Sequence, residues 1–298
     1  MRDDLTTSRI LVETNAVAVD LPQGAVRLPL QSLPAQYADW LEAGRRRLYE
    51  SLAGQTHSVQ FFSQHLPVLV TQTEGSVFPF NCCHKGVGLI PKAEYLSEFI
   101  ELFRTTLAKT ENQPWQESLP QRIQAVSKFY FDREKIDYRA MSTLEIFQRQ
   151  TLQNLRRIPL ASLLFCGDGP DYVSFQLNCA VEILEPDDPR HTFVVLARSL
   201  FEHDSFHLTQ QHFPHAYIFW ITEVIDKTPF RVVTTPERST PPAPDGGLRW
   251  DEEAWLAFQH APAMIQTHIR EQIENYARRK GVTEINLRLV QQAKEELM

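Results

Sequence analysis

The sequence predicts an α+β fold in which an antiparallel sheet packs with helices and is followed by a small three-helix module. Three observations support this fold class. Apolar and polar residues alternate with a period of two over residues 172–184, which is typical of a strand with one buried face. Apolar residues recur at helical spacing over residues 33–48 and 91–107. A Pro-rich stretch, residues 235–247, separates these patterns from a last segment of helical spacing.

The first half of the chain is expected to contribute most of the helices. Their apolar spacing places them over residues 33–48, 91–107, 120–131 and 141–157. Gly54 follows the first helix and Pro159 follows the last, as helix-ending residues do. Residues 9–20 are rich in Ile and Val and predict a strand or a short hairpin. Residues 66–73 predict a strand whose partner is 77–80.

The second half is expected to supply most of the sheet. The strand over 172–184 is followed by turn residues at 185–190, so residues 192–201 can return as its antiparallel partner. Two further apolar stretches, 216–224 and 230–234, extend the sheet. We therefore expect strands from the second half to pack against helices from the first.

Size and charge limit the organisation and the partners. A chain of 298 residues with 43% hydrophobic content can bury one sizeable core and a small satellite. This predicts an α+β domain over residues 1–235, a linker over 236–248 and a helical module over 249–298. The net charge of -7 argues against a general attraction to nucleic acid or anionic lipid. The module is nearly neutral, with seven basic and eight acidic residues.

Targeting signals are weak throughout the chain. No apolar run approaches the ~20 residues that cross a bilayer, so we expect no transmembrane segment, although peripheral membrane association is compatible with the sequence. The first residues contain acids, unlike a secretory signal. Four cysteines without the spacing of a disulfide framework are typical of reduced thiols. These features predict a cytoplasmic protein.

The module over 249–298 can be built from helix start and stop signals. Asp251 precedes two acids and an apolar run, which is how a capped helix begins. Pro262 separates a second helix, and Gly281 provides its C-terminal stop. Asn286 can cap a third helix. Because three short helices fold poorly alone, the module is expected to dock on the rest of the chain or on a partner.

The same residues carry a resemblance to a known family. They are Trp250, Glu253, Ala254, Pro262, 273–278, Gly281, Val282, Ile285 and 293–297. In this order and spacing they resemble the C-terminal domain of the B subunit of light-independent protochlorophyllide reductase. The resemblance covers about a sixth of the chain and leaves residues 1–235 unassigned to any family.

The resemblance implies a metabolic context, tetrapyrrole or photosynthetic metabolism, more than a catalytic activity. In the reductase family this domain lies near the substrate pocket, and the enzyme couples an iron-sulfur cluster to reduction of a tetrapyrrole ring. The cluster ligands and catalytic carboxylate of that family belong to other regions. A tetrapyrrole is therefore a candidate ligand, and a photosynthetic or tetrapyrrole-pathway protein is a candidate partner. The docking candidates are Trp250, Trp255, Tyr276 and Arg278.

A histidine-rich segment is the first candidate site outside the module. His203, His207, His212 and His215 fall within thirteen positions. His203 and His207 are four apart, so on a helix both would face one side and could share a transition metal or flank a cofactor. The commoner explanation of such a segment is a polar connection between two strands, with histidines that are solvated or cap backbone groups.

A second candidate site is the run Cys82, Cys83 and His84, followed by Gly86 and Gly88. A thiolate and an imidazole together can bind iron or zinc. Adjacent cysteines in an extended chain point in different directions, however, and buried structural cysteines are the commoner outcome. The two glycines permit a close backbone approach to a ligand.

Three functions from different classes remain open. The sequence contains no Gly-x-Ser-x-Gly, phosphate loop or paired zinc-cysteine motif, so no catalytic residue is assigned. The leading hypothesis is a non-catalytic accessory or binding protein of photosynthetic or tetrapyrrole metabolism, in which the module docks on a partner or covers a ligand pocket. The alternatives are a metal-dependent or redox enzyme that uses His203 and His207, and a regulatory scaffold without a small ligand.

Overall fold

The computed structural model describes residues 10–54, 64–167, 173–201, 213–228, 247–259 and 263–297. The chain divides into two compact units, Met1–Lys227 and Thr228–Met298. The predicted strand over 230–234 lies outside the described residues, as does the predicted linker 236–248 except for its last two residues. The domain boundary near residue 235 therefore stays a prediction.

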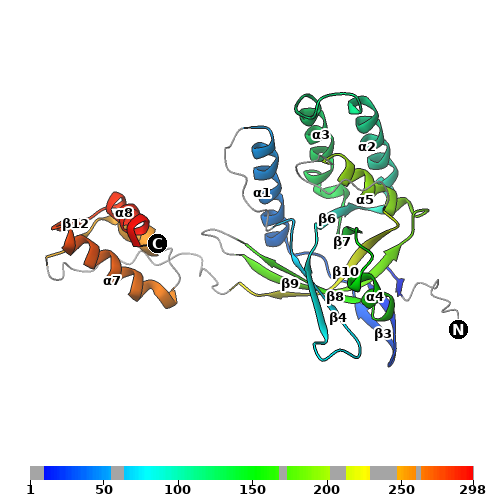
Figure 1. Cartoon of the computed structure of the whole chain (residues 1–298), viewed down its shortest axis with the longest axis horizontal. Helices are drawn as coiled ribbons and strands as arrows, with labels where there is room; N and C mark the ends of the chain where they lie inside the picture. The colour runs from blue at the N-terminus through cyan, green and yellow to red at the C-terminus, as the bar shows by residue number, and fades with distance from the viewer. Residues whose placement is uncertain are drawn as a thin grey trace. The chain divides into compact units, whose positions relative to one another are not determined.

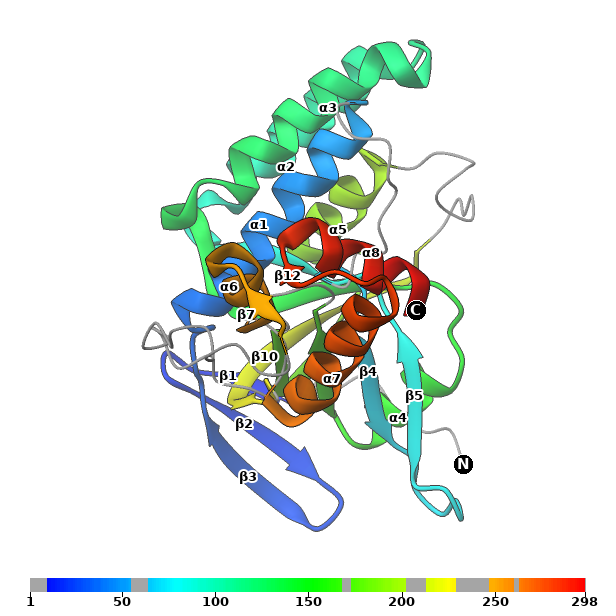
Figure 2. The same ribbon diagram turned by 90° about the vertical axis from the view of Figure 1, so that its left-hand side faces the viewer.

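A small antiparallel sheet begins the described part of the first unit. It consists of β1 (Ile10–Val12), β2 (Ala16–Leu21) and β3 (Gly24–Pro29). Gly24 has a φ of 128°, a conformation that glycine adopts without strain in the turn between β2 and β3. The predicted hairpin is confirmed, and β3 extends it (Figure 2).

A seven-stranded antiparallel sheet forms the centre of the first unit, in the order β5-β4-β8-β9-β10-β7-β6. The strands are β4 (Val68–Gln72), β5 (Phe80–His84), β6 (Gly88–Pro91), β7 (Ile136–Glu145), β8 (Leu160–Cys166), β9 (Ser174–Leu184) and β10 (His215–Asp226). The strands predicted over 66–73, 172–184 and 216–224 are confirmed as β4, β9 and β10. The partner of β4 begins at Phe80, where the predicted partner ends.

The sheet must curl, because its two edge strands are consecutive in the chain. β5 ends at His84 and β6 begins at Gly88, yet they lie at opposite edges of the strand order. Four Cα steps span at most ~15 Å, whereas a flat sheet of seven strands would place its edges roughly 29 Å apart. The short link over 85–87 therefore draws the two edges toward each other at one corner, as in a partly closed barrel.

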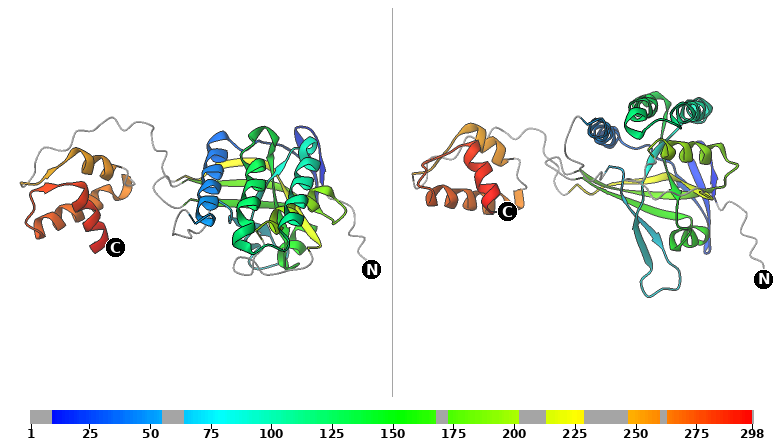
Figure 3. Two further views of the ribbon diagram at one scale, coloured as in Figure 1. Left: turned by 90° about the horizontal axis from the view of Figure 1, so that it is seen from above. Right: turned by 45° about the horizontal axis from the view of Figure 1, so that its top comes forward.

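The helices of the first unit lie mainly on one side of the sheet (Figures 1 and 3). These are α1 (Ala35–Leu52), α2 (Leu96–Thr110), α3 (Trp115–Tyr130) and α5 (Pro189–Ser199), while the shorter α4 (Gln150–Arg157) contacts β4. The core between helices and sheet is aromatic. Phe193 of α5 packs edge-on against Phe129 of α3 at 5.2 Å, and Tyr37 of α1 stacks on Phe175 of β9 at 4.0 Å. The predicted packing of sheet against helices is confirmed.

Two predicted elements are wrong. The helix expected over 141–157 is strand β7 followed by α4, because β7 is buried along most of its length and lacks the alternation that marks a half-buried strand. The strand expected over 192–201 is helix α5. Its β-branched residues favour a strand, but the Asp188 side chain caps the helix by accepting a hydrogen bond from the Arg190 backbone N–H at 2.7 Å.

Two predicted helix starts are also displaced. Pro91 ends strand β6, and α2 begins at Leu96 after a short 3-10 turn over Ala93–Tyr95. α3 begins at Trp115, before the predicted start at residue 120, and carries Pro120 inside it.

The second unit contains the predicted three helices, α6 (Glu252–Gln259), α7 (Ala263–Arg279) and α8 (Leu287–Leu297). Asp251 accepts a hydrogen bond from the Ala254 backbone N–H at 2.6 Å, and Asn286 accepts one from Leu289 at 3.0 Å, so both predicted caps are confirmed. Two short parallel strands, β11 (Arg249–Trp250) and β12 (Glu284–Ile285), were not expected. They tie the start of the unit to the link between α7 and α8.

Candidate ligand-binding site

The first unit contains a cavity of about 710 Å³. Its wall comes from α1, the link between β5 and β6, the end of β7, the start of α4, and α5. This volume falls within the range of roughly 300–1,000 Å³ found for small-molecule sites. The cavity lies at the corner where the link over 85–87 brings the sheet edges together.

About half of the residues that line the cavity are apolar or aromatic. These residues are Leu48, Tyr49, Leu52, Leu66, Leu89, Trp115, Tyr130, Leu144, Ile146, Phe147, Phe193, Val194, Ala197 and Phe201. Phe147 is 56% exposed at the edge of this lining. Such a lining binds a large apolar or aromatic ligand better than a small polar one.

The charged residues of the lining are mostly cations. Arg45, Lys85, Arg149 and Arg198 line the cavity, and Glu145 is the one acid among the lining residues that the structure describes. The whole chain, in contrast, carries a net charge of -7. A cationic recess within an acidic protein concentrates anions locally. The lining thus combines an apolar surface with an excess of positive charge.

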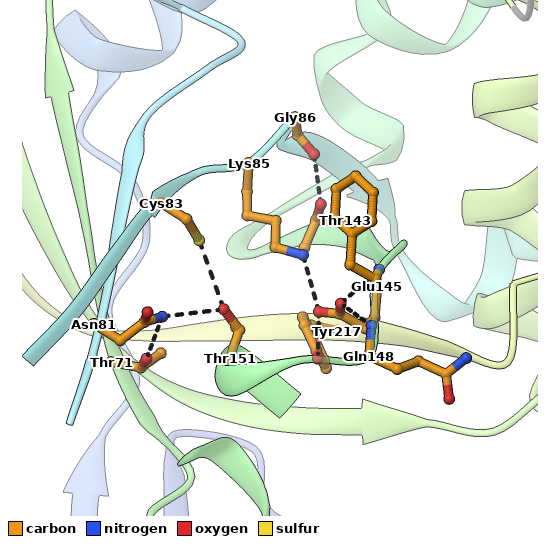
Figure 4. A network of polar contacts seen from close by, with 11 residues as sticks. Thr71, Asn81, Cys83, Lys85, Gly86, Thr143, Glu145, Gln148, Thr151 and Tyr217 are labelled. Atoms are coloured by element: carbon orange, nitrogen blue, oxygen red, sulfur yellow. Dashed lines mark hydrogen bonds and ion pairs between the residues drawn. The ribbon is translucent and has the colours of Figure 1, made fainter. Parts of the chain in front are cut away.

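Lys85, Glu145 and Tyr217 form a buried polar cluster at the cavity wall (Figure 4). Lys85 Nζ donates to Glu145 Oε2 at 2.9 Å, and the side chains are 10% and 2% exposed. The Tyr217 hydroxyl donates to the same oxygen at 2.7 Å. Burial raises the pKa of Tyr217, so its hydroxyl remains a donor at neutral pH.

Glu145 is held as a carboxylate by hydrogen bonds on both oxygens. Oε1 accepts from the backbone N–H groups of Phe147 at 3.0 Å and Gln148 at 2.8 Å. Burial alone would raise the pKa of Glu145, but the charge and hydrogen bond of Lys85, with the hydrogen bond from Tyr217, hold the pKa below its usual value. Gln148 adopts a φ of 48°, a left-handed conformation rare outside glycine, to make this turn.

A neutral polar network lies beside this cluster and joins β4 and β5 to α4. Asn81 donates to the Thr151 hydroxyl at 3.3 Å, and the Cys83 thiol lies 3.6 Å from the same hydroxyl. Asn154 donates to the hydroxyls of Thr71 and Thr73, each at 3.0 Å. Figure 4 shows Asn81 and Cys83 both directed toward Thr151. These contacts position the start of α4 at the cavity wall.

Gly86 of the link and Gly88 at the start of β6 allow close approach by the protein's own side chains. A Cβ atom on Gly88 would lie 2.8 Å from the Tyr130 hydroxyl, and one on Gly86 would lie 3.1 Å from His65 Nε2. The close approach that the sequence predicted for a ligand is thus made here by Tyr130 and His65. A larger residue at position 88 would require the Tyr130 hydroxyl to move.

The residues of the cysteine-histidine run, Cys82, Cys83 and His84, lie in different environments. Cys83 and His84 line the cavity, whereas Cys82 is exposed and is not among the lining residues. His84 Nδ1 lies 3.1 Å from the Leu66 carbonyl oxygen. In the ranges that the structure describes, no three His, Cys, Asp or Glu side chains are grouped so that they could hold a metal ion. Metal binding by this run stays a prediction.

The histidine-rich segment is described only at its end. His203, His207 and His212 lie outside the described residues. His215 is buried at the start of β10, where its Nε2 lies 3.2 Å from Arg156 Nη2. Its Nδ1 lies 3.3 Å from Glu185 Oε1 without the alignment of a hydrogen bond. Burial lowers the pKa of His215, against the opposing charge of Glu185, and the nearby charges of Arg156 and His191 lower it further.

The four docking candidates of the second unit differ in exposure. Trp250 and Tyr276 are buried in the core of this unit. The Tyr276 hydroxyl donates to Glu296 at 2.9 Å. Trp255 is half-buried against Trp250 and Phe258, whereas Arg278 is exposed. Trp250 and Tyr276 therefore hold the module together, and a docking role remains a prediction for Trp255 and Arg278.

Lys85 and Glu145 were missed as site residues because they are sixty positions apart and carry no motif. Glu145 fell within the wrongly predicted helix over 141–157. Lys85 stood directly after the cysteine-histidine run, and its position between two strands was the one available signal.

The first unit is thus a cavity-bearing α+β domain, and one comparison with known proteins finds a similarity in the second. Residues 250–294 match the family model of the "Proto-chlorophyllide reductase 57 kD subunit". The resemblance inferred from the sequence is confirmed over this region. No curated protein matches the chain significantly. The described residues contain no helix whose length and hydropathy would allow it to span a membrane.

Two solved structures show weak similarity to the chain. HupZ from Group A Streptococcus aligns with 10% identity and a TM-score of 0.31, covering 61% of this chain and 93% of that one. A proposed pyridoxamine 5′-phosphate oxidase from Listeria innocua aligns with 9% identity and a TM-score of 0.29, covering 62% of this chain and 98% of that one. At this level of similarity neither structure defines a shared fold or ligand.

Proposed function

We propose that this chain is a non-catalytic accessory protein of tetrapyrrole metabolism that holds an anionic tetrapyrrole in the cavity of its first unit. The observation that carries the proposal is a large apolar cavity with four cationic side chains and one carboxylate, in a chain whose second unit matches a protochlorophyllide reductase family. The family match supports the pathway, and the cavity supports the kind of ligand.

The chemistry of a tetrapyrrole matches both properties of the lining. Its ring system is a large planar apolar surface that packs against aromatic side chains such as Trp115, Tyr130 and Phe193. Its acidic substituents are carboxylates, which favour arginine and lysine partners. A ligand with only one of these properties would leave either the apolar wall or the cations unmatched.

The second unit is proposed to dock on another protein of the same pathway. The exposed Arg278 supplies a charge at its surface, 3.6 Å from Glu274. Charged residues at the edge of an interface steer association. Arg278→Glu should weaken binding to the purified light-independent reductase subunits, whereas Arg288→Glu, a matched change of an exposed arginine on α8, should not. Equal binding by both variants would argue against this docking surface.

Absorbance titration of the full chain with protochlorophyllide and metal-free porphyrins tests the proposed function. We expect a saturable spectral shift with one ligand per chain, and the ligand recovered unchanged after long incubation with a reductant. Absence of a shift with every tetrapyrrole would overturn the ligand assignment. Steady-state conversion of the ligand would instead show an enzyme and overturn the non-catalytic role.

A further inference from the structure

We propose that Lys85 is the inner anchor for a carboxylate of the ligand, so that the acidic edge of the tetrapyrrole faces the sheet and its apolar edge faces the helices. This inference rests on the proposed function, because it assigns an orientation to the ligand in the same cavity. It depends on the chemistry of Lys85, on the saturation of Glu145 and on the two-sided lining of the cavity.

Burial of the Lys85–Glu145 pair is difficult to explain by stability alone. The side chains are 10% and 2% exposed, so both ions have lost most of their hydration. A buried ion pair is often no more stabilising than two apolar residues of similar size. The turn that supplies backbone donors to Glu145 also places Gln148 in a left-handed conformation, which costs free energy. This arrangement fixes a cation at the cavity wall.

The Lys85 ammonium has hydrogen-bonding capacity beyond Glu145. An ammonium carries three N–H donors. Among the residues that the structure describes, Glu145 is the one recorded hydrogen-bond acceptor for Lys85 Nζ. Glu145 itself accepts four hydrogen bonds, from Lys85, Tyr217, Phe147 and Gln148. The carboxylate is therefore saturated, while the ammonium can donate to an acidic group of the ligand.

The other cations of the lining are less suited to this inner position. Arg149 is exposed at the start of α4. Arg45 lies over the Tyr130 ring at 3.6 Å, and Arg198 lies over the Phe213 ring at 4.9 Å. These three arginines instead offset the negative charge that a ligand adds beside the neutral Lys85–Glu145 pair.

The lining differs between its two sides and so favours one orientation. The uncharged polar residues come from β5, β7 and the start of α4, and they are Asn81, Ser142, Thr143, Gln150 and Thr151. Residues of α1 and α5 supply mainly apolar surface, chiefly Leu48, Leu52, Phe193 and Val194, with Arg45 and Arg198 as the two cations of these helices. Thr143, next to the pair on β7, donates to the Gly86 carbonyl at 2.6 Å and stabilises the link that carries Lys85. A carboxylate is solvated better on the polar side.

The test compares protoporphyrin IX with its dimethyl ester, in the same detergent buffer, on the full chain. Wild type should bind the diacid roughly tenfold or more tightly than the ester, because a hydrogen bond to a charged group is worth this much. Lys85→Met should weaken the diacid by a similar factor and leave the ester unchanged. Lys109→Met, an exposed lysine on α2, is the matched control and should bind both ligands as wild type does.

A second variant covers the case in which Lys85→Met fails to fold because Glu145 is left unpaired. Lys85→Met/Glu145→Leu removes both ions and should fold, bind the ester as wild type does, and lose the preference for the diacid. Equal affinity of wild type for diacid and ester, or a double variant that keeps the preference, would overturn the Lys85 anchor. Failure of wild type to bind either porphyrin would instead overturn the proposed function.

Discussion

The two units of the chain differ in what they bury. In the part of the chain that the structure describes, the buried polar and charged side chains all belong to the first unit, among them Lys85, Glu145, Asn154, His191 and His215. The buried residues of the second unit are apolar or aromatic. An apolar core serves stability, whereas buried polar groups persist where hydrogen bonds satisfy them and where a site needs them. The comparison supports the proposals that the first unit binds the ligand and that the second is a compact docking element.

The family resemblance and the candidate ligand-binding site lie in different units of the chain. The second unit carries the recognisable sequence, over residues 250–294, but the pocket described above belongs to the first unit. The proposed pathway therefore rests on the second unit, whereas the proposed ligand chemistry rests on the first. If the two cores are independent, a substitution in one unit should leave the other unit unaffected.

Trp250→Ala should unfold the second unit and leave the first folded. Trp250 packs against Trp255 at 5.5 Å and Phe258 at 5.3 Å in a small core. Truncating a buried tryptophan costs about 3–5 kcal/mol, which is as much as a core of this size commonly supplies. Limited proteolysis with mass mapping should show cleavage within residues 249–298 alone. Protection of that region, or cleavage throughout the first unit, would contradict separate cores.

Glu145→Leu should lower the free energy of unfolding of the first unit by about 3–5 kcal/mol, because it leaves Lys85 buried without its partner. The Lys85→Met/Glu145→Leu variant should recover most of that loss. Urea unfolding followed by near-ultraviolet circular dichroism measures both. Glu98→Leu, which breaks the more exposed pair with Lys135, is the control and should leave the free energy of unfolding nearly unchanged. Equal effects at the two pairs would contradict the special position of Glu145.

Matched N-cap substitutions should weaken each unit separately. Asp188 caps α5 by accepting from the Arg190 N–H at 2.7 Å, and Asp251 caps α6 by accepting from the Ala254 N–H at 2.6 Å. Replacing either with alanine should cost about 1 kcal/mol in its own unit. Hydrogen exchange resolved by peptide locates the loss. Faster exchange in both units after one substitution would show that the two are coupled.

The smallest expected effect is a pH dependence confined to the first unit. The pKa of His215 is lowered from 6.5 by burial, against Glu185 and together with Arg156 and His191. The folded state then binds fewer protons than the unfolded state, so stability is complete above pH 6.5 and falls as the pH drops below it. Urea midpoints at pH 7.5 and 5.5 measure the effect, and His215→Gln should flatten it. An unchanged slope in that variant would assign the dependence to other groups.

The sequence predicted correctly the helices and strands that carry a local signal. Its predictions were wrong where tertiary contacts determine the secondary structure. Asp251, Gly281 and Asn286 mark helix ends by their own chemistry, so the module was predicted closely. The strand β9 shows its alternation directly. β7 was predicted as a helix because burial by neighbouring strands removes that alternation. Residues Thr192 to Phe201 have strand propensity, which the cap at Asp188 overrides.

The candidate site was harder to predict than the fold. Cys83 and His84 were named as candidates and line the cavity, but the ion pair beside them joins Lys85, in the link after β5, to Glu145 on β7. No periodicity or spacing links positions sixty residues apart. The curl of the sheet brings them together, and this curl follows from the order of strands rather than from any local motif.

Filling the cavity tests the central claim most directly. Ala197 on α5 lines the cavity, and Ala197→Trp should occupy the space that the ligand needs. Ala108→Trp, an exposed position on α2, is the matched control. Equilibrium titration with protochlorophyllide should show binding to wild type and to Ala108→Trp, and a loss of at least tenfold in affinity for a folded Ala197→Trp variant. Undiminished binding by that variant would place the ligand elsewhere and contradict the account.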